Sequence, residues 1–136
     1  MALEVFEVRH VADFETAFRA VAQSGNGAVL TLSSPLFSGN LKFLAELALR
    51  HRLAVINQYP DFAEGGGLLG YGPDLQDLFR QAGALTRKAL QAPPGAELPP
   101  VERPVRFRLV ANLKTAQALG LTIPPTLLAR ADEVIE

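Results

Sequence analysis

Apolar residues along this chain recur with two different periods, and the two periods alternate. Alternating or short continuous apolar runs are typical of β-strands, whereas apolar residues three and four positions apart are typical of a helix. The expected strands are residues 3–8, 28–32, 53–56, 68–71 and 105–109. The expected helices are residues 11–22, 41–48, 73–91 and 112–118, with a last helical turn beginning at Pro124-Pro125. Strands that alternate with helices over short connections predict an α/β layered fold with a mostly parallel sheet.

The length of 136 residues suits a single domain, so we expect residues 1–136 to form one α/β unit. Five of the ten prolines lie between residues 92 and 104. Because proline cannot continue a helix or donate to a sheet, this segment is expected to be an extended linker within the domain.

Charge and composition exclude several classes of function. Thirteen basic and fourteen acidic side chains leave a formal charge of -1, which argues against a nucleic-acid partner. The chain has no cysteine, so thiolate metal sites and cysteine nucleophiles are excluded. The two histidines, His10 and His51, are too few and too far apart for a zinc site. The start MALE resembles no signal peptide, so the chain as given would be cytoplasmic unless a targeting segment has been left off.

Residues 65–70 read GGGLLG and satisfy the dinucleotide-binding pattern G-x-G-x-x-G. That pattern carries chemistry only where the glycines join a strand directly to the N-terminus of a helix. Here the glycines lie well after the strand that ends near Ile56, and they lead into an apolar segment. A glycine-rich turn is therefore favoured, no cofactor is expected, and a flavodoxin-like or Rossmann-like enzyme remains the alternative.

Two loops follow expected strands and combine polar with apolar side chains. Ser33-Ser34-Pro35 follows the strand at 28–32, and its serines either cap a helix or hydrogen-bond a small ligand. Residues 57–62, NQYPDF, follow the next strand and place Tyr59, Asp61 and Phe62 close together. Such a mixture suits a pocket wall, although Pro60 and Asp61 also suit a plain turn.

Several segments together resemble the ABC-transporter substrate-binding proteins, in particular the tryptophan/tyrosine-type branch. The segments are SSPLF at 33–37, AELA at 45–48, HRL at 51–53, EGGGL at 64–68 and YGP at 71–73. Two more are LVANLKTA at 109–116 and ALGLTIP at 118–124, and the ending LLARADEVIE at 127–136 also matches. The resemblance implies a three-layer α/β sandwich, one lobe of the type I periplasmic binding protein fold. It covers the second half of such proteins; their first lobe, signal peptide and lipid-attachment cysteine have no counterpart here.

The resemblance also implies a function and partners. The chain would be the ligand-grasping lobe of an ABC-importer binding protein, without catalysis, and its partners would be a small solute such as an amino acid and an ABC permease. A periplasmic or cell-envelope location follows from the same resemblance. In this interpretation the cleft is lined by Ser33, Ser34, Pro35, Tyr59, Asp61 and Phe62. The ring of Tyr59 or Phe62 would stack on the ligand, and Ser34 and Asp61 would hold polar groups such as an amino group. The alternative outside enzymes is a regulatory interaction module that binds no ligand.

In the two-lobed proteins that this chain resembles, the helix matching residues 73–91 packs on the first lobe. Its apolar stripe consists of Leu75, Leu78, Phe79, Ala82, Leu85 and Ala89. Soluble monomers seldom leave so large an apolar surface exposed. We therefore expect a homodimer in which this helix contacts a second copy.

Overall fold

The computed structural model describes residues 3–93, 95–97 and 100–136. The first two residues and three positions of the linker expected at 92–104 lie outside the described residues. The strands are β1 (Ala28–Thr31), β2 (Ala54–Asn57), β3 (Leu69–Pro73), β4 (Phe107–Asn112) and β5 (Glu133–Ile135). The helices are a 3-10 turn η1 (Val11–Asp13), α1 (Phe14–Gln23), α2 (Pro35–Ser38), α3 (Leu41–Arg50), α4 (Asp61–Glu64), α5 (Leu75–Gln91), α6 (Leu113–Leu119) and α7 (Pro125–Leu128).

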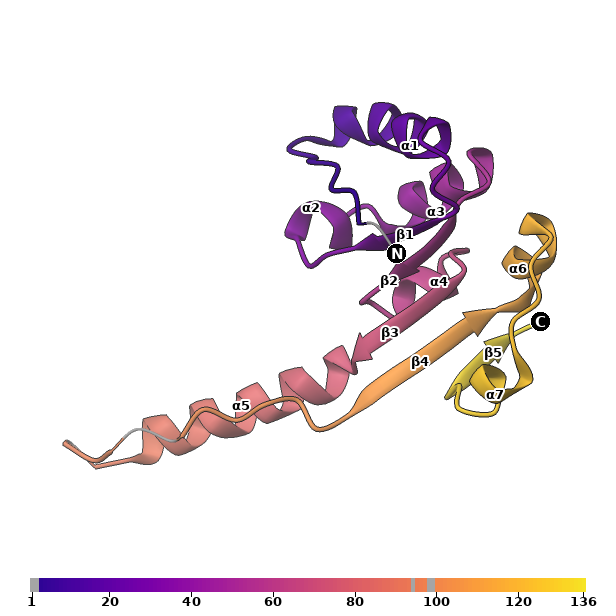
Figure 1. The fold of residues 1–136 in the computed structure, drawn as a ribbon. Helices are drawn as coiled ribbons and strands as arrows, with labels where there is room; N and C mark the ends of the chain where they lie inside the picture. The colour runs from indigo at the N-terminus through magenta and orange to yellow at the C-terminus, as the bar shows by residue number, and fades with distance from the viewer. Residues whose placement is uncertain (1–2, 94, 98–99) are drawn as a thin grey trace.

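The strands form one sheet in the order β1-β2-β3-β4-β5. The first three are parallel to one another, β4 runs antiparallel to β3, and β5 is parallel to β4 (Figure 1). The carboxyl ends of β1, β2 and β3 therefore meet at one edge of the sheet. The amino end of β4 lies at the same edge because β4 runs the other way. The α/β class with a mostly parallel sheet is confirmed.

Two apolar clusters lie on opposite faces of this sheet, because successive side chains of a strand point to opposite sides. Val55 belongs to the cluster formed with α1, α3 and Phe62 of α4. Its neighbour Ala54 packs instead on the second cluster, which α6 and the segment around α7 help to build. The second cluster does not reach β1, where Leu30 remains 64% exposed.

Local sequence signals explain where several helices begin and end. Ser34 accepts a hydrogen bond from the Leu36 amide, with Pro35 at the first position of α2, as a helix N-cap does. Asn112 accepts from the Thr115 amide at the start of α6, and Gly120 ends that helix with a positive φ of 72°. Helix α6 starts and stops where the sequence predicts, whereas α2 is an additional short helix that realises the capping alternative for Ser34.

The strand expected at residues 3–8 is wrong. This segment runs in an irregular extended path outside the sheet, with Leu3 and Val5 85% and 83% exposed. The apolar alternation breaks at Val5-Phe6, and only Phe6 and Val8 reach the core beside α1. Without a paired neighbour, an alternating pattern alone does not make a strand.

Two further elements differ from expectation. The acidic end of the chain, where no strand was expected, forms β5, because the outer edge of β4 offers hydrogen-bond partners to Glu133–Ile135. The segment 57–62, expected to be a loop, contains the first residues of the short helix α4.

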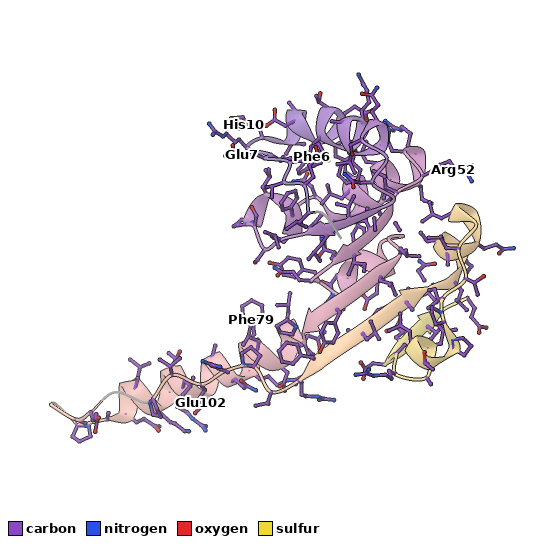
Figure 2. The ribbon with its side chains drawn as sticks, in the orientation of Figure 1. Phe6, Glu7, His10, Arg52, Phe79 and Glu102 are labelled. Carbon is purple, nitrogen blue, oxygen red and sulfur yellow. The ribbon has the colours of Figure 1, made fainter. Side chains whose placement is uncertain are left out.

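Helix α5 projects from the body of the molecule, and the segment that returns to β4 runs back beside it (Figure 1). Asp74 caps the start of α5, because its side chain accepts a hydrogen bond from the Asp77 amide. None of the residues of α5 is buried. Phe79 is 73% exposed, and Figure 2 shows its ring standing out from the helix. The apolar stripe predicted from the sequence therefore contacts little of the rest of the chain.

Candidate functional site

The two loops that the sequence singles out meet at the carboxyl edge of the sheet. Thr31 and Asn57 are register partners at the ends of β1 and β2. Ser33 and Tyr59 each lie two residues beyond that pair, and Ser33 Oγ and Tyr59 Oη share a hydrogen bond of 3.2 Å. In open α/β sheets this edge is where ligands bind.

A closed set of hydrogen bonds holds these loops together. The buried Asn57 donates from Nδ2 to Thr31 Oγ1 at 2.7 Å and accepts at Oδ1 from the Tyr59 amide, also at 2.7 Å. Tyr59 then bonds Ser33, which follows Thr31 by two residues along the chain. We call Thr31, Ser33, Asn57 and Tyr59 the loop clamp.

The hydroxyl pair of the loop clamp still has hydrogen-bonding capacity. A hydroxyl group has one hydrogen to donate and two lone pairs. When Ser33 and Tyr59 bond one another, one of their two hydrogens is used and the other remains for a carboxylate or carbonyl oxygen. Ser33 is exposed and Tyr59 is half-buried, so a ligand can approach both.

The remaining predicted site residues divide into three environments. Ser34 is half-buried and caps α2, while Pro35 is exposed beside it, so both lie in the loop next to Ser33. Asp61 is exposed in the first turn of α4, two residues after Tyr59. Phe62 is fully buried, and its proposed stacking on a ligand is wrong because its ring packs in the core.

The glycine-rich segment serves packing in this fold. Gly65 ends α4, and the three consecutive glycines lead into β3 rather than into the N-terminus of a helix. A Cβ at Gly67 would overlap the Phe62 ring, and a Cβ at Gly72 would overlap the Gln58 carbonyl. Gly70 is crowded in the same way by the backbone of Tyr59 and Pro60. The glycines therefore let residues 58–62 lie directly against β3. This close contact fixes the position of Tyr59 at the sheet edge.

Sequence reasoning placed Asn57 in the loop but assigned it no role, and it missed Thr31 altogether. The signal that could have found them is that Thr31 and Asn57 are polar residues at the ends of two otherwise apolar strands. It also missed Tyr71 and Phe107, which face each other across β3 and β4 with ring centroids 6.0 Å apart and are 56% and 47% exposed. Their contact depends on the antiparallel pairing of β3 with β4, which no local pattern reveals.

Asp74, directly after β3, is a carboxyl at this edge of the sheet with a lowered pKa. The backbone N–H of Asp77, which donates to Asp74, lowers the pKa of the Asp74 carboxyl, with a smaller lowering effect from Arg108 and Arg106. The described residues contain no group of three His, Asp or Glu side chains that could hold a metal ion.

A groove of about 340 Å³ lies beside the candidate site. It runs between residues 3–8, α1 and the outer edge of β1, and its walls include Phe18, Leu30 and Thr31. Ser33 and Tyr59 are not among its lining residues. The groove and the loop clamp are therefore neighbours that share β1.

The fold and this edge define one lobe of an α/β binding protein, with polar loops at the ends of parallel strands. The sequence model of the family described as "ABC transporter substrate binding protein" matches residues 1–135. The chain belongs to that family, whose members are substrate-binding proteins and not enzymes. A comparison with curated proteins found no match.

Solved structures show the same fold. A conserved domain protein from Vibrio cholerae O1 biovar El Tor is 24% identical, with a TM-score of 0.78 over 92% of this chain and 42% of that one. An ABC domain in complex with L-Trp from Streptococcus pneumoniae is 24% identical, with a TM-score of 0.84 over 97% of this chain and 44% of its own. The ligand-free, open form of CD0873, a substrate-binding protein with adhesive properties from Clostridium difficile, is 16% identical, with a TM-score of 0.61 over 94% of this chain and 42% of its own.

The chain thus spans less than half the length of these solved chains. No helix among the described residues is both long and apolar enough to cross a membrane.

Proposed function

We propose that this chain is the ligand-grasping lobe of a solute-binding component of an ABC importer. Its ligand would be a small molecule, an amino acid with an apolar or aromatic side chain. The observation that carries the proposal is the hydrogen bond between Ser33 and Tyr59, which joins two loops at the edge of the sheet where α/β folds bind ligands. The similar fold from Streptococcus pneumoniae, which binds L-Trp, supports the same ligand class.

The chemistry of the exposed groups fits a zwitterionic amino acid. The spare hydroxyl hydrogen of the Ser33–Tyr59 pair would donate to the ligand carboxylate. Asp61, exposed two residues further on, would accept from the ammonium group. The Tyr59 ring would cover the apolar side chain, with Ser34 and Pro35 completing the wall.

NMR titration tests this proposal. L-Trp and L-Leu should shift the amide resonances of Ser33, Ser34, Tyr59 and Asp61. The expected dissociation constant is roughly millimolar, because one lobe buries only part of a ligand. Tyr59→Ala should abolish the shifts, whereas Arg87→Ala on the distant α5 should leave them unchanged. Tight binding of NAD with shifts centred on Gly65–Gly70 would instead support the enzyme alternative.

A regulatory module without a ligand is the other outcome of that titration. It would give no shifts with any amino acid or nucleotide, together with a stable complex with another chain.

For the transport function, the partner would be an ABC permease, and the location would be outside the cytoplasm, as the family implies. Co-purification with a permease encoded next to this gene would test the partner.

We further propose that α5 contacts a second copy of this chain. Leu75, Leu78, Ala82, Leu85 and Ala89 are spaced alternately three and four residues apart, the spacing of a two-helix seam. None of them is buried in the single chain. Two copies related by a two-fold axis would bury both stripes at once.

Light scattering tests this pairing. The unmodified chain should have the mass of a dimer, and Leu78→Glu with Phe79→Glu should give a soluble monomer. Arg80→Glu with Arg87→Glu, which changes the charge of α5 outside the seam, is the matched control. A monomeric unmodified chain would refute the pairing, and burial of α5 by a separate polypeptide would show a different partner.

A further inference from the structure

Asn57 is buried and contacts both loops of the candidate site. Asn57 is 1% exposed and occupies the last position of β2. Its side chain reaches Thr31 on the neighbouring strand and the amide of Tyr59 on its own loop. Both distances are 2.7 Å, which is short for bonds between neutral groups.

The amide orientation of Asn57 follows from its partners. The Tyr59 backbone N–H can only donate, so the atom that faces it must be Oδ1. The Nδ2 group then faces Thr31 Oγ1, which accepts, while the Thr31 hydroxyl points its hydrogen toward the Ile56 carbonyl at 3.4 Å. Asparagine is suited to this place because it combines one acceptor and one donor group at the same distance from the backbone.

The register of the sheet makes this contact a link between the loops. Thr31 and Asn57 are the last paired residues of β1 and β2, so every residue beyond them leaves the ladder of the sheet. The Asn57–Thr31 bond is the side-chain continuation of that ladder. The Asn57–Tyr59 bond turns the chain so that the Tyr59 hydroxyl returns to Ser33.

We propose that Asn57 is a positioning residue, which fixes the Tyr59 ring and the Ser33 hydroxyl in one arrangement before a ligand arrives. The consequence for binding rests on the proposed function of this site. A preformed half-site loses less conformational entropy on binding, so the loop clamp raises affinity without touching the ligand.

Amide hydrogen exchange tests the positioning role without any ligand. Asn57→Ala should raise the exchange rate of the Tyr59 amide about fivefold, the cost of one lost hydrogen bond of average strength. It should also remove the nuclear Overhauser contact between the Tyr59 ring and Ser33. If both readouts stay as in the unmodified chain, the proposal is overturned.

The Thr31 position supplies a matched pair of variants. Thr31→Ser keeps the hydroxyl that accepts from Asn57 and should retain the Tyr59–Ser33 contact. Thr31→Val has nearly the same shape without the hydroxyl, and it should weaken that contact. Val21→Ala, on the buried face of α1, controls for a general loss of stability. If Val21→Ala raises the exchange rate of the Tyr59 amide more than that of neighbouring core amides, the change seen in the Asn57 and Thr31 variants is not specific to the loop clamp.

A titration with L-Trp separates this proposal from the proposed function. Binding that is weakened about fivefold in Asn57→Ala and unchanged in Thr31→Ser supports both. Equal binding by Asn57→Ala and the unmodified chain would overturn the positioning role and leave the function intact. No binding by the unmodified chain would refute the function, and the exchange experiment would still decide the role of Asn57.

Discussion

At the scale of single residues, the absence of a side chain matters as much as its presence. Gly67, Gly70 and Gly72 make room for the Phe62 ring and for the backbone of residues 58–60. The candidate site therefore depends on glycines that cannot touch a ligand. The pattern G-x-G-x-x-G arises here from packing between a loop and a strand, since a nucleotide site would need a helix N-terminus after the glycines.

Gly72→Ala should destabilise the protein and displace the site loop. The added methyl group would overlap the Gln58 carbonyl, a backbone atom that cannot move without shifting Tyr59. The expected loss is about 1–3 kcal/mol in the free energy of unfolding, measured by urea denaturation.

Gly83→Ala is the matched control for that substitution. Gly83 lies within α5 with open space where a Cβ would be, and alanine favours a helix by about 1 kcal/mol. This variant should be as stable as the unmodified chain or more so. Equal stability of the Gly72 and Gly83 variants would contradict the packing role of Gly72.

At the scale of elements, side chains at helix ends join neighbouring helices and strands. Asn112 caps α6 through the Thr115 amide and also donates from Nδ2 to the Ala63 carbonyl at the end of α4. Glu15 of α1 bonds His51 at the end of α3 and forms an ion pair with Arg50. Each of these residues thus holds two elements in place.

Asn112→Ala should lower the free energy of unfolding by about 2 kcal/mol. The lost cap accounts for about 1 kcal/mol, and the lost bond to the Ala63 carbonyl, which still accepts from the Gly66 amide, accounts for about another 1 kcal/mol. Asn112→Asp keeps the cap of α6 and loses the donor to the Ala63 carbonyl. It should therefore lower the free energy of unfolding while leaving the helical circular dichroism signal close to that of the unmodified chain. An alanine variant as stable as the unmodified chain would contradict this role.

The bonds of Glu15 predict a dependence of stability on pH. The hydrogen bond from His51, with the nearby charges of Arg50 and Arg19, lowers the pKa of Glu15 below its ordinary value of 4.5. A carboxyl whose pKa is lower in the folded state contributes stability above 4.5 that is lost as the pH falls through its folded pKa. Thermal unfolding of Glu15→Gln should therefore show a shallower loss of stability below pH 4.5 than the unmodified chain. Identical profiles would show that Glu15 is not responsible.

At the scale of the whole molecule, apolar surface is distributed unevenly. The face of the sheet toward α1 and α3 is covered by a buried cluster, whereas α5 and the outer part of β1 have little cover. Surface of this kind is typical of places where proteins contact a partner.

The proposed pairing through α5 predicts protection that depends on concentration. In dilute solution the amides of Phe79, Ala82 and Leu85 should exchange rapidly, because the helix packs on little else. At high concentration a second copy should cover them and slow their exchange, while core amides such as that of Val55 stay unchanged. Rapid exchange of α5 at every concentration would contradict the dimer.

The sequence by itself determined the α/β class, most helix and strand positions, the helix caps and the two loops of the candidate site. These features depend on local periodicity, on capping side chains and on turn residues, which act over a few positions of the chain. Only the tertiary structure decided that residues 3–8 stay outside the sheet, that Glu133–Ile135 joins it, and that Phe62 points into the core. It also decided that Asn57 joins the loops and that α5 stands uncovered. The reason is that strand pairing, burial and side-chain contacts depend on which distant segments become neighbours, and a local pattern carries no information about that.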